Sequence, residues 1–217
     1  MPRERSEFFR ESSSIEKERI FVLAFEGNNT EEQYFAALKD SKKFNNDLIY
    51  LHLLTRKKRD TNSAPKHVFN KLKKEAKEEF NFADNDELWM IIDTDQWKNI
   101  PEIIGECEKL NNMYVAVSNP CFEFWLLLHI KDITEYSKEE QEKILANAKV
   151  SKNRTYIEKK IIEIIGSHNK SKLQSSKYLP YVTDAINRAR GLSDSSEKFP
   201  TKLGSDVFKI VEKLIKN

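Results

Sequence analysis

Apolar runs that end abruptly in polar residues recur four times between residues 20 and 130. The runs do not alternate with polar positions, which is typical of strands buried on both faces of a sheet. The predicted strands span residues 20–25, 47–54, 87–92 and 113–117. Segments with apolar residues at helical spacing follow them at residues 30–38, 65–80, 100–111 and 122–130. This alternation of strand and helix predicts an α/β fold with a mostly parallel four-stranded sheet and flanking helices.

The pattern changes after residue 131, and from there it predicts helices only. These helices are expected at residues 137–148, 155–165, 181–192 and 205–216. At the other end, residues 1–17 are charged and lack an apolar period, so we expect a mobile tail. The predicted organisation is therefore an α/β domain over residues 18–131 and a C-terminal helical extension over residues 132–217, packed on the same domain.

Composition excludes several classes of protein. The 37 basic and 35 acidic residues nearly cancel, so net charge gives no argument for nucleic acid, although a local patch can still bind it. Five glycines leave no room for a phosphate-binding glycine loop, so any nucleotide hydrolysis is expected from another protein. Two cysteines, with no secretory or membrane-spanning run, make a reducing cytoplasmic location the default expectation and give no sign of a membrane.

Acidic residues follow two of the predicted strands directly. Glu26 ends the first strand, and Asp93 and Asp95 follow the third. Ligands of such sheets bind at the carboxyl ends of the strands, and side chains two residues apart on an extended chain point the same way. Three neighbouring carboxylates repel one another unless a cation neutralises them. Oxygen donors without histidine or cysteine favour Mg²⁺ or Mn²⁺, so the three acids are predicted metal ligands.

Further polar residues near these strand ends have two interpretations each. Glu31 can add a supporting acid or interact with the helix N-terminus. Thr30 is a plausible N-cap of that helix, with Gln33 as its capping-box partner. Glu123, in the apolar setting Phe-Glu-Phe, can act as a fourth catalytic acid or merely favour a helix dipole. Asn119 can orient a phosphate group or build the entry to the same helix.

Basic residues that could hold nucleic-acid phosphates occur in three groups. The first follows the second strand and comprises Arg56, Lys57, Lys58 and Arg59. The second contains Lys152 and Arg154, and Lys152 is the candidate for stabilising charge in the transition state. The third and weakest comprises Lys170, Lys172 and Lys177. Each group is equally consistent with a solvated surface.

Three motifs together resemble the RloB family, which has a Toprim-like fold related to OLD-type nucleases. They are EGNNTEEQYF, DTDQW and SNPCFEFWLLLH, starting at Glu26, Asp93 and Ser118, and the resemblance extends over most of the chain. It implies a metal-dependent, nuclease-like effector of antiphage defence or abortive infection. It also implies control by a separately encoded ABC- or AAA-type ATPase, with transfer RNA, other RNA or DNA as the substrate.

The leading hypothesis is therefore a Mg²⁺- or Mn²⁺-dependent endonuclease. A second hypothesis is a phosphohydrolase with Asp93 as nucleophile and Asp95 as general acid, since an Asp-x-Asp after a strand suits that chemistry too. A third is a non-catalytic adaptor subunit of an ATPase complex. The sequence leaves open the substrate, the number of metal ions and whether the chain forms a homo-oligomer.

Overall fold

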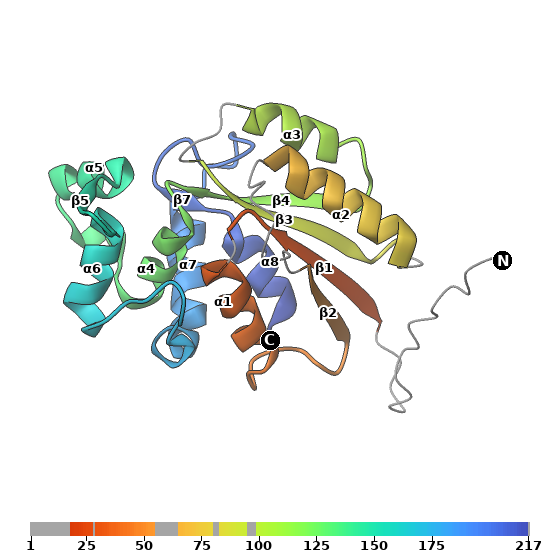
Figure 1. Ribbon diagram of the computed structural model, residues 1–217, viewed down its shortest axis with the longest axis horizontal. Coiled ribbons are helices and arrows are strands. Elements are labelled where there is room, and N and C mark those ends of the chain that lie inside the picture. The colour runs from red at the N-terminus through yellow and green to blue at the C-terminus, as the bar shows by residue number, and fades with distance from the viewer. Residues whose placement is uncertain (1–17, 28, 55–64, 80–82, 95–98, 217) are drawn as a thin grey trace.

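A central β-sheet organises the molecule (Figure 1). The computed structural model describes residues 18–27, 29–54, 65–79, 83–94 and 99–216. Its strands, in sheet order, are β2 (Ile49–Leu54), β1 (Arg19–Phe25), β3 (Glu87–Asp93), β4 (Met113–Asn119) and β7 (Gly204–Ser205). The first four of these are parallel, as predicted, and β7 joins β4 antiparallel. Parallel pairing brings the carboxyl ends of β1, β3 and β4 to one edge of the sheet.

Helices cover both faces of the sheet (Figure 1). One face carries α2 (Pro65–Glu79) and α3 (Ile100–Cys107), whose apolar residues pack against Val22, Met90 and Ile92. The other face carries a larger core built on Phe21, Leu23 and Ile91. The helices that contribute to that second core include α1 (Thr30–Lys39), α4 (Phe122–Ile130), α6 (Tyr156–Ile165), α7 (Val182–Leu192) and α8 (Val207–Leu214).

Helix α4 is apolar on every side, and this explains its position. A helix that is hydrophobic all round must be enclosed, and α4 lies with α6 and α7 packed against it. Arg188 of α7 binds its last turn, because Nη1 donates hydrogen bonds to the carbonyl oxygens of Leu128 (2.7 Å) and His129 (3.0 Å). The buried His129 ring accepts a proton poorly, and burial lowers its pKa to about 3. His129 is thus a structural residue.

The region after residue 131 is only partly helical, contrary to the prediction. Helix α5 (Lys138–Ala146) is followed by an antiparallel pair, β5 (Lys149–Ser151) and β6 (Arg154–Thr155), before α6 begins. The short 3-10 helices are η1 (Ile133–Glu135), η2 (Ser175–Lys177) and η3 (Leu179–Tyr181). Strand β7 lies where a helix was expected to begin, because Asp206 N–H donates to the Val117 carbonyl (2.8 Å) and so extends the pairing with β4.

Within the described ranges, no helix is long and apolar enough to cross a membrane.

Candidate functional site

Glu26 and Asp93 lie side by side at the carboxyl edge of the sheet. The Glu26 N–H donates to the Ile91 carbonyl (3.0 Å), which continues the β1–β3 pairing beyond the strand. The Asp93 N–H in turn donates to Glu26 Oε2 (3.0 Å). Adjacent parallel strands thus bring these two acids together, as the sequence predicted. Asp95, the third predicted ligand, lies outside the described residues, as do residues 1–17 and the basic residues Arg56, Lys57, Lys58 and Arg59.

Glu31 belongs to the same acid cluster. It lies in the first turn of α1, and its carboxylate folds back over Gly27, where a side-chain carbon added to the glycine would come within 2.2 Å of Glu31 Oε1. A side chain at residue 27 would therefore displace the Glu31 carboxylate. Burial raises the pKa of Glu31 from 4.5 to about 7, and the nearby Glu123 and Glu26 carboxylates contribute to that rise against the opposing charge of Lys170. Glu31, predicted as a secondary acid, is therefore enclosed among like charges.

Glu123 connects this acid cluster to a lysine. The Glu123 residue is 6% exposed and lies in the first turn of α4. Lys170 Nζ lies 3.1 Å from Glu123 Oε1 and 3.0 Å from Glu158 Oε1. Burial lowers the pKa of Lys170, but the Glu123 and Glu158 carboxylates outweigh that effect and raise it overall. Lys170 is therefore a fixed positive charge at the margin of the acids, with about half of its side chain exposed.

Gln33 binds the segment that carries Lys170, and it does not act as the capping-box partner that the sequence predicted. Its Nε2 donates to the carbonyl oxygens of Asn29 (2.9 Å) and Lys170 (2.8 Å), and its Oε1 accepts from Leu173 N–H (2.8 Å). The expected capping box is wrong, because Asn29 is the N-cap and makes no side-chain cap bond. Thr30 instead lies inside the helix and turns its hydroxyl to Glu123 Oε1 (3.4 Å).

Asn119 has both of its amide atoms engaged within the chain. Its Oδ1 accepts a hydrogen bond from Thr94 Oγ1 (2.9 Å), and its Nδ2 donates to the Pro200 carbonyl (3.0 Å). The neighbouring Ser118 hydroxyl bonds to that of Ser205 (2.9 Å). Asn119 thus links the end of β4 to the C-terminal segment that carries β7. A contact of Asn119 with phosphate stays a prediction.

The two residues of the second basic group, Lys152 and Arg154, differ in their contacts. Lys152 lies in the exposed turn between β5 and β6, and its role in catalysis stays a prediction. Arg154 is exposed, but its Nη1 donates to the His168 carbonyl (3.2 Å). Sequence reasoning gave Lys170 little weight and overlooked Glu158 and His168. The only local signal for Glu158 was the Thr-x-x-Glu capping box that opens α6.

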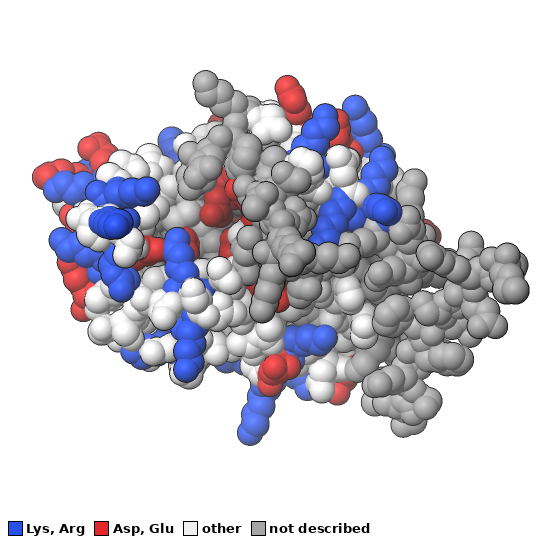
Figure 2. All heavy atoms as spheres, viewed as in Figure 1, with Lys and Arg blue, Asp and Glu red and all other residues white. Residues whose placement is uncertain are grey.

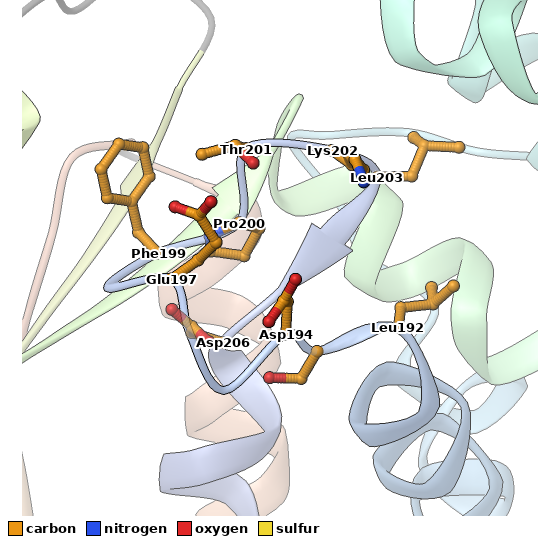
Figure 3. A pocket seen from close by; sticks show the side chains of 10 residues that line it. Leu192, Asp194, Glu197, Phe199, Pro200, Thr201, Lys202, Leu203 and Asp206 are labelled. Carbon is orange, nitrogen blue, oxygen red and sulfur yellow. The ribbon is translucent and has the colours of Figure 1, made fainter.

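Two acids of the cluster are buried, since Glu31 is 7% and Glu123 is 6% exposed. Figure 2 shows acidic atoms recessed near the middle of one face, with basic side chains beside them. A cavity of about 70 Å³ lies next to β7 (Figure 3). Its lining includes the charged residues Asp194, Glu197, Lys202 and Asp206, and it includes none of the predicted site residues. The predicted chemistry therefore depends on the acid cluster and not on this cavity.

The comparisons with known proteins identify one family. The family model described as RloB-like protein matches residues 21–214, which is most of the chain. No curated protein and no solved structure matches the sequence.

Proposed function

This chain belongs to the RloB-like protein family, and from that premise we propose that it is a Mg²⁺- or Mn²⁺-dependent endonuclease that cleaves nucleic acid in antiphage defence. The observation that carries the proposal is the meeting of Glu26, Glu31, Asp93 and Glu123 at one edge of the sheet, with Lys170 at its margin. Control by a separately encoded ATPase belongs to the same proposal.

The acid cluster suits a hard divalent cation. Its donors are carboxylate oxygens, which Mg²⁺ and Mn²⁺ prefer. Burial first, and then the Glu123 and Glu26 carboxylates, raise the pKa of Glu31 to about 7, and a bound dication would relieve the repulsion between these acids. Glu26 and Asp93 would hold the ion, with Asp95 as a third ligand. When bound, such an ion polarises a phosphoryl oxygen and lowers the pKa of water.

The surrounding residues have separate tasks in this proposal. Glu26 fixes the backbone of Asp93 through its hydrogen bond, so the two acids keep a constant spacing. Lys170, anchored by Glu123 and Glu158, offers its ammonium group to a phosphate beside the acids. Because its contacts to Glu123 place it beside the acids, Lys170 takes the electrostatic role that the sequence had suggested for Lys152.

The test is a cleavage assay of the purified chain on transfer RNA, single-stranded DNA and plasmid with Mn²⁺ or Mg²⁺. Glu26→Gln and Asp93→Asn should each lower the rate by at least about 100-fold, since loss of an outer-shell partner alone costs about 10- to 100-fold. Glu139→Gln is the matched control, because Glu139 is exposed on α5 and pairs only with Lys143 among the described residues. Thermal unfolding checks that each variant is folded.

The outcomes separate the alternatives. Wild-type cleavage by both strand-end variants would exclude the proposed site. An adduct with fluoroberyllate at Asp93 would instead favour the phosphohydrolase. A chain that cleaves no nucleic acid, yet co-purifies with an ATPase, would favour the adaptor.

A further inference from the structure

A second group of potential metal ligands lies beside Lys170, which contacts two of its three members. Glu123 comes from α4, Glu158 from α6, and His168 from the segment after α6. One potential ligand atom from each of the three lies within 4.8 Å of the other two. The residues are 6%, 4% and 7% exposed, so the group is enclosed by protein. The set differs from the strand-end acids in containing a nitrogen donor.

The His168 ring gives independent evidence for a ligand. Its Nδ1 bonds to the Tyr178 hydroxyl (3.3 Å), which orients the ring. Its Nε2 is buried and has no hydrogen-bond partner in the described part of the chain. A buried polar atom without a partner costs free energy, so such atoms commonly mark the place of a ligand.

Hydrogen bonds from neighbouring residues also hold the Glu158 and Glu123 carboxylates in place. Glu158 Oε2 accepts from Thr155 N–H (2.9 Å), which leaves Oε1 turned toward Lys170. The Thr30 hydroxyl contacts Glu123 Oε1 (3.4 Å). Second contacts of this kind orient metal ligands and reduce the cost of arranging them.

We propose that Glu123, Glu158 and His168 bind a transition-metal dication, Zn²⁺ or Mn²⁺, in preference to Mg²⁺. One imidazole nitrogen with two carboxylates suits these ions, whereas Mg²⁺ prefers oxygen alone. Donors around Zn²⁺ at about 2.0–2.2 Å lie about 3.4 Å apart, so modest side-chain rotation closes the observed spacing. The site shares Glu123 with the acid cluster of the proposed function, but it uses none of the strand-end ligands Glu26, Asp93 and Asp95.

Lys170 competes with the metal in this arrangement. Its ammonium group contacts both carboxylates and supplies the positive charge that they need without an ion. About half of the lysine side chain is exposed, so the ammonium group has access to solvent when an ion takes its place. Removal of Lys170 should therefore strengthen metal binding by about 10-fold or more, the effect of one neighbouring charge on a partly buried site.

The experiment is a titration of the chelator-treated full chain with Zn²⁺, Mn²⁺ and Mg²⁺ by isothermal calorimetry. We expect one Zn²⁺ per chain, at least about 10-fold weaker in His168→Ala and Glu158→Gln and tighter in Lys170→Met. Glutamine can still form the capping box, so Glu158→Gln keeps the start of α6. His67→Ala is the matched control, because His67 is an exposed histidine on α2.

Several results would contradict the proposed metal site. Wild-type Zn²⁺ affinity in both His168→Ala and Glu158→Gln would overturn the site, and so would loss of binding in His67→Ala or in Glu26→Gln alone. If His168→Ala fails to fold by circular dichroism, Glu158→Gln decides. Because the readout is binding, cleavage can fail while this site is present, and the site can fail while cleavage persists.

Discussion

Replacement of Glu31 by glutamine should stabilise the metal-free protein, and more strongly as the pH rises. The Glu31 residue is 7% exposed, and its pKa is raised from 4.5 to about 7, first by burial and then by Glu123. Between these two values the folded state binds more protons than the unfolded state, so stability falls as the pH rises through this window. Below pH 4.5 the penalty is absent, and above pH 7 it is complete.

The magnitude follows from the pKa. A rise from 4.5 to about 7, at about 1.36 kcal/mol per pKa unit, costs about 3 kcal/mol at pH 8. Loss of a negative charge near the N-terminus of α1 costs about 0.3–1 kcal/mol in the other direction. Glu31→Gln should therefore gain about 2–3 kcal/mol at pH 8, which is roughly 5–10 °C in the melting temperature of a chain of this size. At pH 5 the gain should be close to zero.

The assay is urea unfolding followed by circular dichroism in EDTA at pH 5, 6, 7 and 8, with both proteins compared at each pH. Glu32→Gln is the matched control, because it removes the adjacent, half-buried carboxylate and should change stability by less than about 0.5 kcal/mol. A gain in Glu31→Gln that does not vary with pH, or a loss at pH 8, would refute the electrostatic account of the cluster.

Three further outcomes are expected from the same contacts. Gln33→Ala removes the bond to Leu173 N–H, so hydrogen exchange of that amide should accelerate by about 10-fold, and unchanged exchange would contradict this role. Gly27→Ala places a carbon 2.2 Å from Glu31 Oε1, so it should weaken Mn²⁺ binding in calorimetry, unlike Gly105→Ala, where the space is open. Burial raises the pKa of the Cys107 and Cys121 thiols, so Ellman's reagent should label both only in denaturant; labelling of the native protein would show that at least one of them is accessible.

The parallel sheet and the meeting of two acids were predictable because both follow from local patterns. Long apolar runs define the buried strands, and parallel pairing then forces Glu26 and Asp93 to one edge. Strand β7 was not predictable, since two residues, Gly204 and Ser205, carry no hydrophobic pattern. Its place depends on hydrogen bonds to β4.

The position of Lys170 at the site was not predictable for a similar reason. Nothing in the sequence around Lys170 distinguishes it from other exposed lysines. Its position is set from a distance, by Gln33 of α1 and by the carboxylates of Glu123 and Glu158. Such contacts between remote segments leave no periodic signal for sequence reasoning to detect.

The bond between Gln33 and Lys170 joins residues 137 positions apart, and this has a consequence for synthesis. The ribosome makes Glu26, Glu31, Asp93 and Glu123 before it makes their cationic neighbour Lys170. A nascent chain therefore carries the repelling acids before the ammonium group that balances them. The cluster gains that counter-charge only late in translation, so chains interrupted before Lys170 retain the acids without their lysine.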